Sequence, residues 1–299
     1  MKIIFMGTPD FAIPSLKALL ESHNSVIAVV TTPDKERGRG QKVTYTAVKE
    51  FALQNNIEVL QPVSLKDESF TSRLKELQAD LYVVVAFRIL PKEVYTIPPK
   101  GAFNLHGSLL PKYRGAAPIQ WAIINGEKET GLTTFFLQEK VDTGNVILKE
   151  KVEILDSDDF GSLHDKMSPV GAGLVLRTVD LIEKGDVPVE TQDNTTATPA
   201  PKITKETAQI DWNKPAVQIQ NLIRGLSPYP GACFIHNGKV IKIYKSSLNL
   251  EKKLSPGEIY QTKTEAVIGC GKDAINLLEV QAEGRRRMGI EEFLRGYKF

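Results

Sequence analysis

The fold of this chain is decided by two apolar runs, Leu-Tyr-Val-Val-Val-Ala-Phe at residues 81–87 and Ala-Phe-Asn-Leu-His at residues 102–106. Both are short. The first is rich in valine and aromatic residues and the second alternates around Phe103 and Leu105, so each predicts a buried strand. Earlier in the chain, strand-like runs alternate with helix-like segments, at residues 3–6 and 25–31 for strands and 11–21 and 67–77 for helices. Apolar strands that alternate with amphipathic helices form βαβ units, which predicts an α/β fold with a mainly parallel sheet.

The alternating pattern continues to residue 184. Further strands are expected at residues 131–138 and 146–154, and a long helix at residues 160–184. Pro169 lies inside that helix, where a proline removes a backbone hydrogen bond, so we expect a bend or break there.

The character of the sequence changes at residues 192–204. Residues 195–201, Thr-Thr-Ala-Thr-Pro-Ala-Pro, are small or proline and lack periodicity, which is typical of a linker. Five short strand-like runs follow, at residues 233–236, 240–244, 258–260, 266–268 and 274–280. Short strands at this spacing, with a hairpin signal at Asn237-Gly238, predict a small β-barrel of the OB type. We therefore expect a domain at residues 1–190, a linker at 191–208 and a C-terminal domain at 209–299.

Asn104 and His106 are the strongest candidates for a reactive site. They lie two residues apart in an expected strand, so their side chains project from the same face. An amide and an imidazole side by side can hold a carbonyl oxygen as it gains negative charge. The alternative is a structural histidine beside a polar neighbour. The Gly107-Ser108 turn and the apolar Leu109-Leu110-Pro111 favour a ligand site, because they let the backbone approach a ligand and supply a wall.

Asp142 is the carboxylate that we expect to join them. It lies in Val141-Asp142-Thr143-Gly144, between two expected strands, where it could orient the imidazole or take a proton. Asp-Thr-Gly is also an ordinary turn signal, so this interpretation depends on Asp142 lying near Asn104 and His106. The three residues together predict an acyl- or formyl-transfer enzyme rather than a phosphate enzyme.

The turn after the first strand excludes two other classes of enzyme. Gly7-Thr8-Pro9 lacks the further glycines of a dinucleotide fingerprint and the Lys-Ser/Thr of a phosphate loop. This argues against a nicotinamide enzyme and against an NTPase.

Basic residues gather in two places. Residues 32–42 are expected to form a Gly/Arg-rich loop after the end of a strand. Its Arg37, Arg39 and Lys42 are suited to bind phosphates. Near the C-terminus, Arg285, Arg286 and Arg287 follow a glycine. Residues 209–299 hold fourteen Lys and Arg against nine Asp and Glu, while the preceding residues hold twenty-four against twenty-seven. This asymmetry indicates a polyanionic partner, with chance distribution of surface charge as the alternative.

Cysteine usage and hydropathy point to an ordinary intracellular protein. Cys233 and Cys270 lie far apart without metal-ligand spacing, so we expect no metal site and no disulfide framework. No window approaches the roughly 20 apolar residues of a membrane span, and the N-terminal apolar run is too short for a signal sequence. We expect a cytoplasmic protein without membrane contacts, active as a monomer.

Five segments of the chain resemble the methionyl-tRNA formyltransferase family. Residues 6–12, 104–119 and 142–144 match the N-terminal part of that family, and residues 226–232 and 284–288 with 293–296 match its C-terminal part. The central block at 104–119 is shared by all enzymes that use 10-formyltetrahydrofolate. The two C-terminal segments indicate the branch that acts on tRNA.

The resemblance implies a fold, a reaction and a set of site residues. It implies a Rossmann-like formyltransferase domain, a linker and an OB-like C-terminal domain, with 10-formyltetrahydrofolate as formyl donor and initiator methionyl-tRNA as acceptor. Asn104, His106 and Asp142 match the catalytic residues of the family. The folate-contacting segment is matched by Ser108, Leu109, Leu110 and Pro111, and the loop with Arg37, Arg39 and Lys42 resembles an insertion that contacts the acceptor stem.

The chain departs from the family pattern at Phe87-Arg88. The resemblance leads us to expect a Tyr-Gly pair there, so this wall of the pterin pocket should differ, and Arg88 is a cation without an explanation. Three other functions remain open at this stage. They are sugar-nucleotide formylation, hydrolysis of formyltetrahydrofolate, and tRNA binding without turnover.

Overall fold

The computed structural model describes residues 1–37 and 42–299. The chain forms two compact units, each built from discontinuous segments. The first unit comprises residues 1–115, 131–152 and 164–199, and the second comprises residues 116–130, 153–163 and 200–299. The domain boundaries expected at residues 190 and 208 remain predictions.

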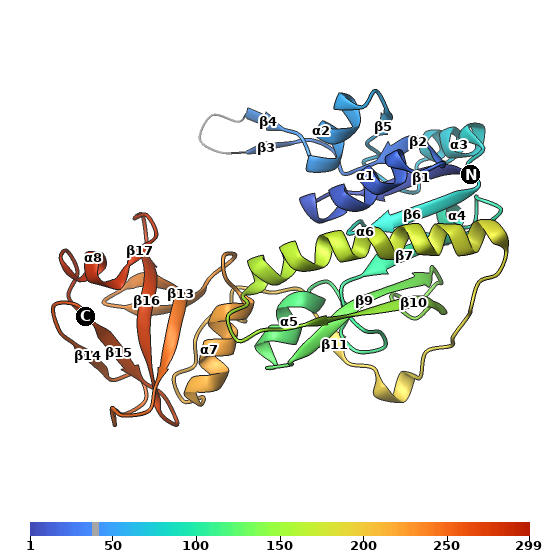
Figure 1. Ribbon diagram of the computed structural model, residues 1–299. Helices are drawn as coiled ribbons and strands as arrows, with labels where there is room; N and C mark the ends of the chain where they lie inside the picture. The colour runs from blue at the N-terminus through green and yellow to red at the C-terminus, as the bar shows by residue number, and fades with distance from the viewer. Residues whose placement is uncertain (38–41) are drawn as a thin grey trace. The chain divides into compact units, whose positions relative to one another are not determined.

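The first unit is built on a seven-stranded sheet of order β10-β9-β7-β6-β1-β2-β5 (Figure 1). Strands β1, β2, β5, β6 and β7 are parallel, and β9 is antiparallel to β7. The strands are β1 (Lys2–Gly7), β2 (Ser25–Val30), β5 (Glu58–Leu60), β6 (Leu81–Val85), β7 (Ala102–His106), β9 (Glu129–Phe136) and β10 (Val146–Glu153). All five residues of β6 are buried, as expected for a central strand covered on both faces. The predicted Rossmann-like, mainly parallel sheet is confirmed.

Helices connect and cover these strands. They are α1 (Ile13–Glu21) with a preceding 3₁₀ turn η1 (Asp10–Ala12), α2 (Ala47–Gln54), α3 (Glu68–Leu77), α4 (Lys92–Tyr95) and α6 (Phe160–Lys184). The Asp67 carboxylate accepts from the Ser69 N–H and caps α3, where the sequence predicts a helix start. Helix α6 continues through Pro169, so the bend or break expected there does not interrupt it. Its Gly171 faces Leu105 of β7 and Leu132 of β9, which places α6 against these two strands (Figure 1).

Three regions differ from the sequence-based expectation. The predicted loop at residues 32–42 contains an antiparallel hairpin of β3 (Lys35–Arg37) and β4 (Lys42–Thr44). The predicted linker contains a 3₁₀ turn, η2 (Asn194–Thr196), and strand β11 (Pro199–Ala200), which pairs with β8 (Arg114–Gly115). Helix α5 (Pro118–Ile124) was not predicted. Strand β11 depends on its pairing with the distant β8, which local sequence patterns do not reveal.

The second unit contains an antiparallel sheet of order β12-β13-β16-β15-β14, with β17 on β16. Its elements are α7 (Ala216–Gly225), β12 (Ala232–His236), β13 (Lys239–Asn249), β14 (Ile259–Gln261), β15 (Ala266–Gly269), β16 (Ala274–Ala282), β17 (Met288–Gly289) and α8 (Ile290–Leu294). Asn237 and Gly238 both have positive φ, as the predicted two-residue hairpin requires. Ile219 and Ile223 of α7 pack into the core with the sheet residues Ile243 and Ile275. The predicted OB-like architecture is confirmed as a curled half-barrel.

Candidate functional site

A cavity of about 80 Å³ opens in the first unit beyond the carboxyl ends of β6 and β7. Strand β6 ends at Val85, two residues earlier than predicted, because Ala86 adopts a left-handed conformation and turns the chain. Ligands of parallel α/β sheets bind at this edge. The lining side chains come from the strand ends and from two loops: Val84, Phe87, Arg88, Ile89, Leu90, Tyr95, Asn104, Phe135, Leu137, Gln138, Glu139, Lys140, Val141 and Asp142.

Asn104 presents a free amide to this cavity. It lies in the middle of β7, is half-buried, and lines the cavity together with Asp142. Within residues 1–37 and 42–299, its side chain makes no hydrogen bond. An amide that is largely withdrawn from water without a partner is available to a ligand oxygen.

His106 is held in one tautomer. Its ring is buried, and Nε2 lies 2.8 Å from the carbonyl oxygen of Tyr113. A carbonyl only accepts hydrogen bonds, so Nε2 carries the proton and Nδ1 holds the lone pair in the neutral ring. Phe135 packs edge-on against the imidazole, with ring centroids 6.5 Å apart, and limits its movement.

Asp142 is fixed in a tight turn. It has a φ of +54°, and its Oδ2 accepts a hydrogen bond of 2.9 Å from the Gly115 N–H. The Gln192 amide donates to the carbonyls of Asp142 and Gly144, at 3.0 and 2.7 Å, and holds the turn on both sides. The turn predicted from the sequence is therefore present, and the reactive-site interpretation of Asp142 stays a prediction.

The three predicted residues converge. Oδ2 of Asp142 lies 3.8 Å from Nδ1 of His106, and Asp142 and Asn104 line the same cavity. At 3.8 Å the carboxylate and the ring are too far apart for a hydrogen bond but close enough to attract each other if Nδ1 is protonated. The arrangement can therefore stabilise an imidazolium, which would donate from Nδ1.

The segment predicted to contact folate, Ser108 to Pro111, is held by internal hydrogen bonds. Ser108 Oγ donates to the Lys112 carbonyl at 2.6 Å, and Leu110 is 1% exposed. The Leu110 N–H donates to Oγ1 of Thr133, whose own hydroxyl proton goes to the Ser108 carbonyl. None of Ser108, Leu109, Leu110 and Pro111 is among the residues that line the cavity. In this conformation the segment shapes the turn after His106.

The sequence analysis missed one wall of the cavity. Residues 137–141 line it, although their sequence gives no signal beyond proximity to Asp142. Arg88 also lines the cavity, and its departure from the family pattern was the available signal. Arg88 donates to the carbonyls of Val63 and Pro62 and lies 5.3 Å from the centre of the Phe87 ring. Burial lowers the pKa of its guanidinium.

The basic residues predicted to bind nucleic acid differ in their surroundings. Arg39 lies outside the described residues, and of Arg37 and Lys42 only the backbone is described, as facing positions of the hairpin. In the second unit, Arg287 forms a bidentate ion pair with Glu279, and Arg286 forms an ion pair with Glu292. Arg285 is exposed, and no carboxylate among the described residues pairs with it.

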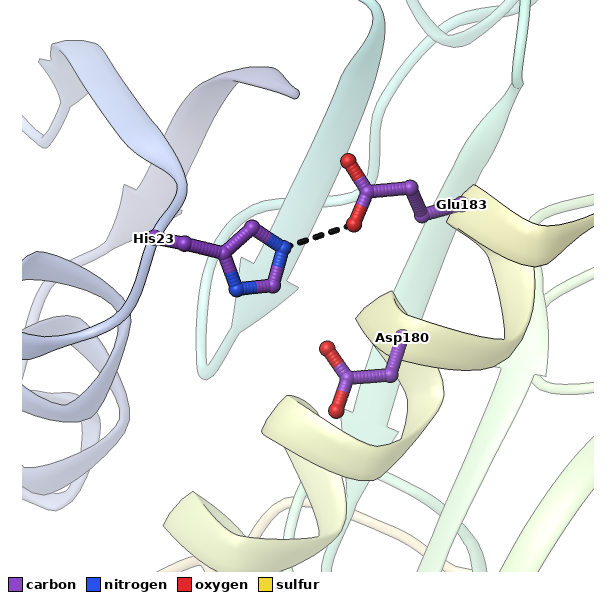
Figure 2. A group of neighbouring side chains, drawn as sticks. All are labelled: His23, Asp180 and Glu183. Atoms are coloured by element: carbon purple, nitrogen blue, oxygen red, sulfur yellow. Dashed lines mark hydrogen bonds and ion pairs between the residues drawn. The ribbon is translucent and has the colours of Figure 1, made fainter.

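One group in the described part of the chain has the composition of a metal site. The ligand atoms of His23, Asp180 and Glu183 all lie within 4.8 Å of one another (Figure 2). However, Nε2 of His23 lies 2.7 Å from Oε2 of Glu183, and the Met1 ammonium lies 3.3 Å from Oε1. These hydrogen bonds lower the pKa of Glu183, with the His23 contact as the larger cause. The group is explained as an exposed ion-pair network. Separately, no helix among the described residues is long and apolar enough to cross a membrane.

Solved structures confirm the fold. An N-formyltransferase from Helicobacter canadensis, in complex with folinic acid and dTDP-3-aminofucose, superimposes with a TM-score of 0.71 at 22% identity, covering 96% of this chain and all of that one. A methionyl-tRNA formyltransferase from Clostridium thermocellum gives a TM-score of 0.58 at 18% identity, covering 84% of this chain and 95% of that one.

Sequence comparison identifies the family. The formyl transferase model matches residues 1–179, and the formyl transferase C-terminal domain model matches residues 202–298. The methionyl-tRNA formyltransferase of Caldanaerobacter subterraneus is 50% identical over 99% of this chain and 97% of its own length. That of Flavobacterium johnsoniae is 48% identical over all of this chain and 97% of its own. The chain therefore belongs to the methionyl-tRNA formyltransferase family.

Proposed function

We propose that this protein transfers the formyl group of 10-formyltetrahydrofolate to the α-amine of initiator methionyl-tRNA, which gives N-formylmethionyl-tRNA for translation initiation. The observation that carries the proposal is geometric: Asn104 and Asp142 line one cavity, and Oδ2 of Asp142 lies 3.8 Å from Nδ1 of His106. Relatives of that name match this chain over nearly its whole length.

The cavity suits the ring system of a folate. Val84, Phe87, Leu90, Phe135 and Leu137 supply apolar walls, with polar groups at Asn104 and Asp142. The Helicobacter canadensis enzyme, which shares the fold, was solved with a folate compound bound. We expect the segment from Ser108 to Pro111 to support this site, either directly or by holding the turn after His106.

In the proposed reaction the methionyl amine attacks the formyl carbon. A new C–N bond forms, the carbonyl electron pair moves to oxygen, and the oxyanion accepts hydrogen bonds from the Asn104 amide and from protonated Nδ1 of His106. Collapse of this intermediate breaks the bond to N10 of the folate. The proton lost by the amine reaches N10, and Asp142 stabilises the imidazolium and assists this transfer. Placing both substrates in near-attack geometry supplies further acceleration.

The acceptor contacts belong to the basic residues. Arg285 is the best placed of the C-terminal arginines, because it has no internal partner among the described residues. Arg286 and Arg287 can contact the tRNA only by giving up their ion pairs with Glu292 and Glu279, so we assign them a smaller share of the binding. Arg37, Arg39 and Lys42 are further proposed tRNA contacts. We place the reaction in the cytoplasm, where translation supplies its acceptor, and expect a monomer with domains at 1–190 and 209–299.

The test is incubation of the protein with 10-formyltetrahydrofolate and methionyl initiator tRNA, followed by detection of formyl-methionine after hydrolysis of the ester. Matched reactions receive an amino-sugar nucleotide or no acceptor. Formylation of the tRNA supports the proposal. Formylation of the sugar, release of formate without an acceptor, or salt-sensitive tRNA binding without turnover would each replace it with another function.

A further inference from the structure

Arg88 lies at the mouth of the cavity. Its Nη1 donates to the Val63 carbonyl at 3.0 Å and its Nη2 to the Pro62 carbonyl at 2.7 Å. Val63 is 84% exposed and Ile89, the next residue along the chain from Arg88, is 71% exposed. These neighbours place the guanidinium at the rim of the cavity, in contrast to the fully buried β6 strand behind it.

The charge of Arg88 is not balanced by the protein. In the described portion of the chain no carboxylate pairs with it, and its Nε–H is buried without a hydrogen-bond partner. The two carbonyls that it contacts supply dipoles but no negative charge. A partly desolvated cation without a carboxylate partner is an attractive site for an anionic ligand, because pairing restores the solvation that burial removed.

We propose that Arg88 binds a carboxylate of the glutamyl tail of the folate donor. It thereby makes this cavity specific for folates that carry the glutamyl tail. The inference rests on the proposed function. The formyl-bearing N10 lies between the ring system and the aminobenzoyl-glutamate. If the rings occupy the apolar interior and N10 stays near Asn104 and Asp142, the tail leaves through the mouth. There the exposed Val63 and Ile89 offer an apolar surface to the aminobenzoyl ring, and Arg88 offers a positive charge to the carboxylates.

A purely structural role for Arg88 makes a different prediction. If the guanidinium only holds residues 62 and 63 in place, its loss would loosen the cavity for every ligand. A tail-binding role affects only ligands that carry the tail. Comparing a tailed with a tail-less ligand therefore separates the two roles.

The experiment measures binding by titration calorimetry with folinic acid and with 5-formyl-6-methyltetrahydropterin, which has the ring but no tail. The proteins are the wild type, Arg88→Gln, Arg88→Lys and Lys140→Gln, with Lys75→Gln as an exposed charge-loss control on α3. We expect Arg88→Gln to raise the Kd for folinic acid roughly 10-fold, the usual effect of losing one charge-assisted hydrogen bond. The Kd for the pterin should stay within twofold. The Kd of Arg88→Lys for folinic acid should lie between those of the wild type and Arg88→Gln, because lysine keeps the charge but cannot form two parallel hydrogen bonds to a carboxylate.

Three results would overturn the inference. The first is an equal loss of affinity for both ligands in Arg88→Gln, and the second is no loss for either. The third is a weaker affinity for folinic acid in Lys140→Gln together with an unchanged affinity in Arg88→Gln. That result would assign the tail contact to Lys140. If the wild type binds neither ligand, the folate assignment itself fails and the inference falls with it. If the wild type binds folinic acid and Arg88→Gln binds it equally well, the inference about Arg88 fails but the proposed function stands.

Discussion

Nδ1 of His106 faces Oδ2 of Asp142 across 3.8 Å, while the opposite ring nitrogen donates to the Tyr113 carbonyl at 2.8 Å. The Tyr113 contact occupies the proton of the neutral ring. For His106 to donate a hydrogen bond towards the cavity it must therefore hold a second proton on Nδ1, next to the carboxylate. The role of Asp142 then lies in stabilising that charge as well as in orienting the ring.

The charge of Asp142 can be tested with Asp142→Asn. Asparagine tolerates the left-handed conformation of this residue, and its carbonyl can still accept from the Gly115 N–H, so the turn should survive. Without the carboxylate the imidazolium loses its partner, and we expect the single-turnover rate to fall roughly 10²–10⁴-fold. The Kd for folinic acid should change little. A rate within threefold of the wild type would remove Asp142 from the proton transfer.

The free amide of Asn104 leads to a second prediction. Asn104→Ala removes a donor that makes no hydrogen bond within the described residues, so the fold should lose little stability. The transition state would lose one hydrogen bond, and we expect turnover to fall about 10²–10³-fold with folate affinity largely kept. Rapid-quench measurement of formyl-methionine, with calorimetry on the same preparation, checks both quantities. A parallel loss of folate affinity would instead make Asn104 a ground-state binding residue.

Much of the first unit could be predicted from the sequence, because its strands are buried on both faces and read as continuous apolar runs. The Asn104–His106 pair could be predicted too, since side-chain alternation in a strand is a local property. Asp142 could be proposed only through its expected proximity to Asn104 and His106 and through the family resemblance, because its turn signal is common to many surface turns. The hairpin in residues 32–44 was missed because glycines and charges dominate that stretch.

The remainder of the candidate site depends on tertiary structure. Residues 137–141 line the cavity only because β9 is placed beside β7, which no local pattern specifies. The hydrogen bond from the Ser108 hydroxyl to the Lys112 carbonyl could not be predicted either, and the expected folate contact of Ser108 stays a prediction. Arg88 was recognisable as unusual, whereas its orphan Nε–H and its position at the rim required coordinates.

The turn that carries Asp142 packs too closely to accept a larger residue at Gly144. A Cβ atom there would lie 1.7 Å from the carbonyl oxygen of Phe136, a backbone atom that cannot move freely. We expect Gly144→Ala to lower the free energy of unfolding by about 2–3 kcal/mol and to reduce turnover by displacing Asp142.

Gly173 in α6 is the matched control for Gly144, because a Cβ atom there meets nothing within 4 Å. Gly173→Ala should stabilise the helix by roughly 0.5–1 kcal/mol. Urea denaturation followed by circular dichroism compares the two variants. Equal effects of the same sign would contradict the packing argument.

The Glu279–Arg287 ion pair makes stability depend on pH. Hydrogen bonds from the Arg287 guanidinium lower the pKa of Glu279 from its ordinary 4.5. A carboxyl group with a lowered folded-state pKa contributes stability above its unfolded pKa, and this contribution is lost as pH falls through the folded value. Glu279→Gln should therefore destabilise the second unit by about 1 kcal/mol at neutral pH, and the difference should shrink on acidification.

Intrinsic fluorescence measures this effect selectively, because both tryptophans, Trp121 and Trp212, belong to the second unit. Urea titrations of the wild type and Glu279→Gln at a series of pH values give the difference in unfolding free energy. A difference that grows as the pH falls would reverse the predicted sign.

The three C-terminal arginines should affect tRNA binding unequally. Arg285 has no carboxylate partner among the described residues, so it can bind a phosphate without breaking an internal contact. We expect Arg285→Ala to weaken tRNA binding and to reduce the salt dependence of the affinity by about one phosphate contact. Arg287 is bound to Glu279 and lies 4.4 Å from the centre of the Tyr244 ring, so Arg287→Ala should mainly lower stability.

Arg295→Ala is the control for Arg285→Ala, since Arg295 is an equally exposed arginine of the same unit that already pairs with Glu291 at 3.3 Å. Filter binding to initiator tRNA at several salt concentrations gives the slope of log K against log salt for each variant, and thermal unfolding gives its stability. If Arg287→Ala changes the slope while Arg285→Ala and Arg295→Ala do not, the ion pair with Glu279 must open on binding. The assignment of the phosphate contact to Arg285 would then be wrong, because the partnered arginine would be the one that reaches the RNA.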